Sequence, residues 1–237
     1  IEPMVEGDAV YGALLTPQGK ILFDMFLFFD GHTFLIDCAK SQKQALLTRL
    51  NMYKLRANVL FGEGNDLEAG VSPRETIHAL RYRDPRLEDM GWRIMVPESR
   101  LKHEPGYHAQ RIELGLADSD ADLGSGAYFP HEANLDQLNG VSFTKGCYVG
   151  QEVVSRMEHR GTARSRILPV MLNGDPPSDT SEIRSGDKMI GTLLSSAGRR
   201  ALALIRLDRL GEATEPLLTN AVTVSVLIPR WARYDVL

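Results

Sequence analysis

One octet of the sequence, KGCYVGQE, combines residue types and spacings that suit thiol chemistry. Cys147, one of two cysteines in the chain, lies between Gly146 and Gly150, and Lys145 precedes it by two residues. A helix is predicted to begin near Gly150, and the amide groups and dipole at its start would favour a negatively charged sulfur. Lys145 adds a cation, and the glycines allow a sharp turn that leaves the thiol uncovered. The thiolate is the reactive form of cysteine, so the octet predicts an exposed, activated thiol. An inert loop cysteine is the alternative.

The cysteine count limits the kind of metal site that the chain can form. A cluster bound only by cysteines needs more thiolates than the two present, and no CxxC or HExxH spacing occurs. Cys147 could lend one ligand to an iron–sulfur cluster shared with a partner, whereas Cys38 ends an apolar strand and is expected in the core. A pair of Cys147 with His131 or His159 is conceivable, but no local pattern supports it. Both histidines are expected to be structural or on the surface.

Charge and hydropathy exclude several classes of function. The formal charge of −4 and the pI of about 5.9 argue against a general nucleic-acid binder. No apolar run is long enough to span a membrane, no signal segment opens the chain, and the few cysteines indicate a reducing compartment. A basic cluster follows the octet; it is either a solvated helix face or a surface for an anionic partner. Its members are Arg156, Arg160, Arg164 and Arg166.

The elements that must position the thiol can be predicted from the pattern. Two strands are expected around a turn at Thr16–Gly19, with a third strand over 33–38. Residues 61–89 are expected to be irregular, with strands that the pattern does not place. Residues 117–130 are expected to form a small acidic loop, either exposed or lid-like. Helices are expected over 40–55 (starting at Lys40 or Ser41), 106–114 and 150–160. A strand is expected over 91–97, and short strands over 166–172, 188–196, 200–207 and 221–228. The last four predict a small antiparallel barrel or sandwich that begins near Gly161.

The octet and its flanks resemble the YgfZ-type folate-binding proteins. These are bacterial relatives of mitochondrial iron–sulfur assembly factors, in the superfamily of the glycine cleavage T protein. The resemblance covers nearly the whole chain, through GALLTPQGKILFDMFLF, DPRLEDMGWR, FPHEANLDQLNGVSFTKGCYVGQEVVSR, GDKMIGTLLSS and ALALIRLDR. The sequence departs from the family by starting at Ile1, without the usual first strand and helix, and by a short region over Asn58–Asp84.

The resemblance implies a fold and a ligand. The fold is α+β: an aminomethyltransferase-like folate-binding domain over 1–160, then a C-terminal antiparallel β-barrel over 161–237, around a central cavity for tetrahydrofolate. RIELG resembles the segment whose glutamate holds the pterin ring, which assigns that role to Glu113; a carboxylate can accept two parallel N–H bonds from the ring. Further candidates for contacts with the ring or the tail of the folate are Tyr11, Tyr148, Gln151 and Arg166.

The family also implies a function. It favours a folate-dependent accessory factor for assembly or repair of iron–sulfur clusters, with scaffold or client proteins as partners and indirect support of tRNA modification. The compartment would be a bacterial cytoplasm or a mitochondrial matrix. The alternative is a glycine-cleavage aminomethyltransferase, but Asp37 stands in that enzyme's Asn place and Gln44 in its catalytic aspartate place. Aminomethyl transfer is therefore not expected. A redox or tRNA-binding module without folate is the third class, and the acidic pI and the RIELG match count against it.

Overall fold

The structure is a computed structural model, and the chain divides into two compact units. The first unit comprises Ile1–Leu14 and Phe23–His103, and the second comprises Leu15–Leu22 and Glu104–Leu237. The first barrel strand begins at Ser165, close to the boundary expected near Gly161, but the second unit also includes the segment before this strand. The described residues are 4–64, 66–72, 74, 75, 77, 80–97, 99, 106–161, 163–178 and 180–235.

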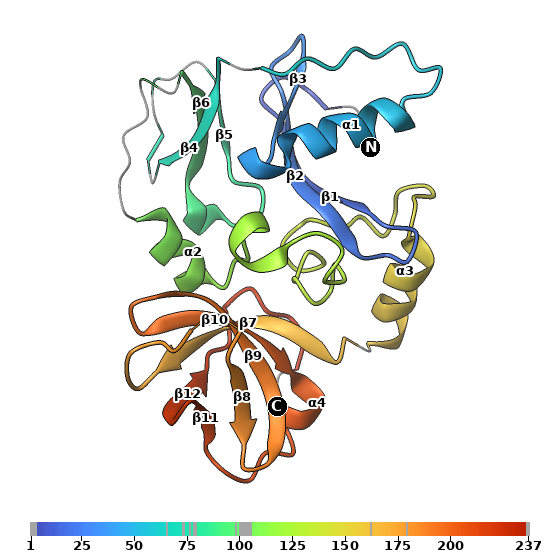
Figure 1. Cartoon of the computed structure of the whole chain (residues 1–237). Coiled ribbons are helices and arrows are strands. Elements are labelled where there is room, and N and C mark those ends of the chain that lie inside the picture. The colour runs from blue at the N-terminus through green and yellow to red at the C-terminus, as the bar shows by residue number, and fades with distance from the viewer. Residues whose placement is uncertain are drawn as a thin grey trace. The chain divides into compact units, whose positions relative to one another are not determined.

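The first sheet is a three-stranded meander in the order β1-β2-β3 (Figure 1). It contains β1 (Ala9–Leu15), β2 (Ile21–Phe29) and β3 (Phe34–Asp37), and β2 pairs antiparallel with β3 so that Phe26 lies opposite Asp37. The short 3₁₀ helix η1 (Lys40–Gln42) leads into α1 (Lys43–Tyr53). The predicted hairpin, third strand and helix are confirmed.

The second sheet of this unit has the order β4-β6-β5. It contains β4 (Glu68–Ser72), β5 (Leu80–Arg83) and β6 (Trp92–Val96), and the 3₁₀ helix η2 (Glu88–Met90) precedes β6. The strand over 91–97 is confirmed, and β4 and β5 are the two strands that the pattern of residues 61–89 did not place. Both are short and polar, and both form by antiparallel pairing with β6, which a local pattern cannot reveal.

The C-terminal strands form a closed six-stranded barrel in the order β10-β7-β12-β11-β8-β9, which confirms the predicted barrel. Its interior is apolar, and Gly191 of β9 allows the strands to approach closely, because a Cβ there would lie 2.4 Å from the Leu204 carbonyl oxygen. The elements are β7 (Ser165–Leu172), β8 (Glu182–Ser185), β9 (Lys188–Ala197), β10 (Arg200–Arg206), α4 (Leu207–Leu210), β11 (Leu217–Thr219) and β12 (Val222–Val226).

Helix α2 (Tyr107–Leu114) is held against the barrel by a buried arginine. Arg111 is 1% exposed and donates to Asp122 Oδ2 at 2.6 Å, to the Leu116 carbonyl at 3.1 Å and to Ser195 Oγ at 2.9 Å. Asp122 Oδ1 accepts from the Ser195 amide at 3.0 Å. We call Arg111, Asp122 and Ser195 the Arg111 cluster. It fixes the helix to β9.

The acidic stretch after α2 was expected to be an exposed loop, but part of it is a turn with buried residues. Residues Ser119–Leu123 form one π-helical turn, η4, in which Asp122 and Leu123 are buried. Asp118 caps this turn by accepting from the amides of Asp120 and Ala121. The prediction was wrong because Arg111 supplies a buried partner for Asp122, and composition alone does not reveal that partner.

The remaining helix, α3 (Gln151–Arg160), follows the octet directly and confirms the predicted helix over 150–160. It begins after Gly150 and ends at Gly161, and both glycines have left-handed backbone conformations. None of the described helices combines the length and the hydropathy that a membrane-spanning helix needs.

Candidate thiol site

The segment that carries the thiol is a loop with an exposed surface. Residues 141–149, here called the thiol loop, contain neither helix nor strand, and Cys147 is exposed on it. Gln151 ties the end of the loop to α3, because its side-chain oxygen accepts from the Tyr148 amide at 3.0 Å and its own amide donates to the Tyr148 carbonyl at 3.3 Å. The loop therefore presents Cys147 immediately before the first turn of a helix, as the octet predicts. Cys38 is only partly accessible.

Lys145 lies over an aromatic ring of the same loop. Its Nζ is 4.7 Å from the centre of the Tyr148 ring, so the cation–π contact folds the lysine back along the loop. Burial raises the pKa of the Tyr148 hydroxyl, and that buried oxygen has no hydrogen-bond partner among the described residues. Lys145, Cys147, Tyr148 and Gln151, which were predicted for two different roles, thus lie together in one short segment.

The two glycines of the octet differ in what requires them. Gly146 has open space around its Cα and no left-handed backbone angle. Gly150 has a φ of +83°, and a Cβ there would lie 2.8 Å from Gly19 Cα. The described structure therefore requires glycine at Gly150, where the chain turns and the backbones approach closely, but shows no such requirement at Gly146.

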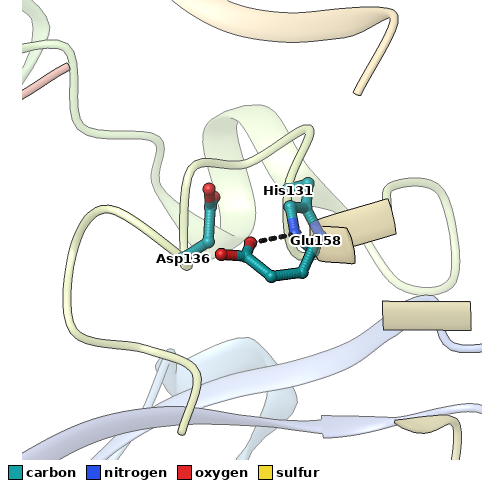
Figure 2. Close-up of side chains that lie close together, drawn as sticks. All are labelled: His131, Asp136 and Glu158. Carbon is teal, nitrogen blue, oxygen red and sulfur yellow. Dashed lines mark hydrogen bonds and ion pairs between the residues drawn. The ribbon is translucent and has the colours of Figure 1, made fainter. Parts of the chain in front are cut away.

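A group of metal-ligating residue types lies beside α3. Figure 2 shows His131, Asp136 and Glu158, whose donor atoms all lie within 4.8 Å of one another. His131 Nε2 is 3.1 Å from Glu158 Oε2, which confirms a hydrogen-bonded structural role for His131. Both oxygens of Asp136 accept from the guanidinium of Arg166, at 2.6 and 3.0 Å. A cation bound here would compete with that guanidinium for Asp136, so the geometry favours a hydrogen-bonded cluster over a metal site.

Arg166 is buried, unlike Arg156 and Arg164 of the predicted basic cluster. Its guanidinium also stacks on Tyr234 at 4.1 Å and donates to the His131 carbonyl at 2.8 Å. Since Asp136 already neutralises its charge, Arg166 is not a free cation for a folate tail. Arg156 and Arg164 are exposed, and the side chain of Arg160 lies outside the described residues.

The other predicted folate contacts, Glu113 and Tyr11, lie in different units. Glu113 is on α2 with 60% of its side chain exposed, 3.5 Å from the guanidinium of Arg200. Tyr11 is buried in the first unit, where its hydroxyl donates to Asp24 at 3.0 Å. Burial and the nearby Asp24 carboxylate raise the pKa of Tyr11 well above its usual value.

Sequence reasoning missed a buried group of charged and aromatic residues in the first unit. Arg93 and Tyr82 both donate to Asp37, at 2.6 and 2.8 Å, and Arg86 forms a buried pair with Asp84. Both guanidinium groups face the ring of Phe26, at 4.2 Å for Arg93 and 4.8 Å for Arg86. A signal was available, because both arginines lie in the segment DPRLEDMGWR, but buried arginine cannot be told from exposed arginine by type.

Comparisons with known proteins agree on the relationship and on the fold. A protein-family model described as "CAF17, C-terminal beta-barrel domain" matches residues 164–234. The mitochondrial iron–sulfur cluster assembly factor IBA57 of Mus musculus is 31% identical over 94% of this chain and 72% of its own length, and the protein of Homo sapiens gives the same values.

A solved structure supports the fold independently. The aminomethyltransferase T of the glycine cleavage system from Bartonella henselae superposes with a TM-score of 0.69 over 97% of this chain and 78% of that chain. Its sequence identity of 15% supports the fold alone. With an α+β fold of this type, a C-terminal barrel and relatives of this identity, the chain belongs to the IBA57/YgfZ family and is a homologue of iron–sulfur cluster assembly factors.

Proposed function

We propose that this protein assists the assembly or repair of iron–sulfur clusters by lending the Cys147 sulfur as one ligand of a cluster held together with a partner protein. The observation that carries the proposal is the exposed Cys147 on the thiol loop, in a chain whose one other cysteine is only partly accessible. Iron–sulfur clusters need several thiolates, so the remaining ligands come from the partner. A cysteine-bearing scaffold or client protein meets this need.

The names of the relatives support a role in iron–sulfur cluster assembly. The mouse and human proteins are named as mitochondrial iron–sulfur cluster assembly factors. In a eukaryote the chain would act in the mitochondrial matrix, and in a bacterium it would act in the cytoplasm. Enzymes that use iron–sulfur clusters to modify tRNA would then depend on it indirectly, without binding of RNA by this chain.

Tetrahydrofolate is the cofactor that we propose. The resemblance of RIELG supports it and assigns the pterin to Glu113, whose carboxylate is accessible. Aminomethyl transfer is not part of the proposal, because Gln44, in the place of the catalytic aspartate, is a neutral side chain on the exposed side of α1. The ion pair with Arg93 also neutralises Asp37, which stands in the enzyme's Asn place.

Complementation with a cysteine variant tests the proposal. Cells that lack the protein receive the wild-type chain, Cys147→Ser or the control Cys38→Ala, and the activity of cluster-dependent enzymes is measured. We expect Cys147→Ser to fail and Cys38→Ala to restore activity. In calorimetric titrations with tetrahydrofolate, wild type and Cys147→Ser should bind equally. Full restoration by Cys147→Ser would overturn the shared-ligand role, and absence of binding by the wild-type protein would remove folate.

A further inference from the structure

The turn of the first hairpin packs directly against the start of α3. A Cβ at Gly150 would lie 2.8 Å from both Gly19 Cα and the Thr16 carbonyl oxygen, and 3.1 Å from the Gly19 amide nitrogen. A Cβ at Gly19 would in turn lie 3.0 Å from the Gly150 carbonyl oxygen and 3.1 Å from Val153 Cβ. Backbone meets backbone here, so neither side can yield by rotating a side chain.

Hydrogen bonds hold the turn at Thr16–Gly19 in place. Within it, Thr16 donates its amide to the Lys20 carbonyl at 2.8 Å, and Gly19 donates to the Thr16 carbonyl at 2.9 Å. Beyond it, the Ile21 amide donates to the Tyr128 carbonyl at 2.8 Å, and the Ile21 carbonyl accepts from the Gly126 amide at 2.7 Å. These bonds hold the turn to the segment 126–128 of the same unit, independently of α3.

The thiol loop has few other anchors. The hydrogen bonds that the structure describes for residues 141–149 join them to one another or to Gln151. Apart from the contact of the Phe143 ring with His131, at 6.1 Å between centres, and the burial of the Tyr148 hydroxyl, the loop is held at its junction with α3. Gly150 is that junction, so the contact with Gly19 lies where the loop ends and the helix begins.

We propose that Gly19 and Gly150 are positioning residues for the thiol. The turn at Thr16–Gly19 packs against Gly150 and thereby fixes the end of the thiol loop that carries Cys147. That a fixed position of Cys147 matters for activity rests on the proposed function, in which Cys147 binds a cluster held by a partner. A side chain at either glycine pushes the start of α3 away from the turn, and the loop loses its fixed end.

The test compares glycines that share backbone strain but differ in contacts. Gly19→Ala and Gly150→Ala are made alongside Gly161→Ala at the other end of α3. Gly161 has a φ of +57°, and none of the described residues lies within 4 Å of its added Cβ. All three pay the cost of a left-handed alanine, and only the first two create an overlap. A nitroxide on Cys147, in a Cys38→Ala background, reports mobility of the loop, and hydrogen exchange reports protection of the Tyr148 and Gln151 amides.

We expect Gly19→Ala and Gly150→Ala to increase nitroxide mobility and to speed exchange at these two amides by about tenfold, while Gly161→Ala changes neither. In the double variant the second substitution should add less than it does alone, because the contact is already broken. If Gly150→Ala does not fold, Gly19→Ala alone decides the matter, since its overlaps are milder. Unchanged mobility and exchange in Gly19→Ala would overturn the positioning role.

Complementation separates this inference from the proposed function. Gly19→Ala should lower the activity of cluster-dependent enzymes, and Gly161→Ala should retain it. If the loop is more mobile in Gly19→Ala but Cys147→Ser is fully active, the positioning role of Gly19 stands and the shared-ligand function of Cys147 is refuted. Loss of activity in Cys147→Ser with an unaltered loop in Gly19→Ala would do the reverse.

Discussion

The Arg111 cluster and the thiol loop both lie in the second unit, but their polar groups have opposite surroundings. Arg111 is buried, and its guanidinium donates to a carboxylate, a carbonyl and a hydroxyl. The thiol loop exposes Cys147 and Lys145, and its hydrogen bonds stay within the loop or reach Gln151. In the Arg111 cluster, a buried ion pair and its hydrogen bonds to Ser195 hold α2 to the barrel. In the thiol loop, the thiol of Cys147 stays exposed and the loop has fewer packing contacts. The free energy of unfolding should therefore depend more on buried charged residues than on the exposed loop, and variants at a buried, a half-buried and an exposed site test this order.

The largest effect is expected from the buried arginine. Arg111→Ala leaves Asp122 buried without its cation, which should lower the free energy of unfolding by about 3–5 kcal/mol. Urea denaturation measures this loss. The control is Arg200→Ala, which removes an exposed partner of Glu113 and should cost less than about 1 kcal/mol. Equal losses in the two variants would show that burial does not set the difference.

An intermediate effect is expected at Glu132, which is half-buried. Burial is the main cause that raises the pKa of this carboxyl, although its oxygen accepts from the Phe129 amide at 2.9 Å. A raised pKa means that the stabilising contribution of Glu132 is complete below the unfolded value near 4.3 and is lost as the pH rises through the folded value. Glu132→Gln keeps an acceptor for Phe129 without the charge.

At pH 7 the free energy of unfolding of Glu132→Gln should therefore exceed that of the wild type. The difference should be less than about 1 kcal/mol after allowance for solvent screening. The advantage should shrink as the pH falls below the folded pKa. Urea midpoints of the two proteins between acidic and neutral pH provide the measurement. A Gln variant that is less stable at pH 7 would mean that attraction to Lys20 outweighs burial.

The smallest effect is expected in the thiol loop. Lys145→Ala removes the cation from the Tyr148 ring, and at an exposed site this should cost about 0.5 kcal/mol. A double-mutant cycle with Tyr148→Leu isolates the pair. A coupling free energy of about 2 kcal/mol or more would place the loop with the Arg111 cluster and remove the contrast.

The sequence predicted well those elements whose signal is local. The first hairpin, α1, α2, α3 and four barrel strands follow from alternation, helical spacing and turn residues. The short barrel strands β8 and β11 were not predicted. The exposed Cys147 also follows, because the adjoining glycines and the helix start are its sequence neighbours. The resemblance to a family added the overall fold, which local spacing does not supply.

The features that were missed depend on partners distant in the sequence. RIELG drew attention to Glu113, which is exposed, and not to Arg111 two residues earlier, which is buried. Helical geometry places these two side chains on different faces, but the residue that covers one face, Ser195, comes from the barrel. Burial of Asp122, pairing of Arg166 with Asp136 and the contact of Gly150 with Gly19 escaped prediction for the same reason.

The tip of the first hairpin has a practical consequence for dissecting the protein. Leu15–Leu22 groups with the second unit, although the chain on either side of it belongs to the first. The second unit is therefore not one uninterrupted stretch of the gene. A fragment that starts at Glu104 would retain the barrel and the thiol loop but would lack the turn against which Gly150 packs. A minimal version of this unit would need the hairpin supplied as a separate peptide or joined by a linker.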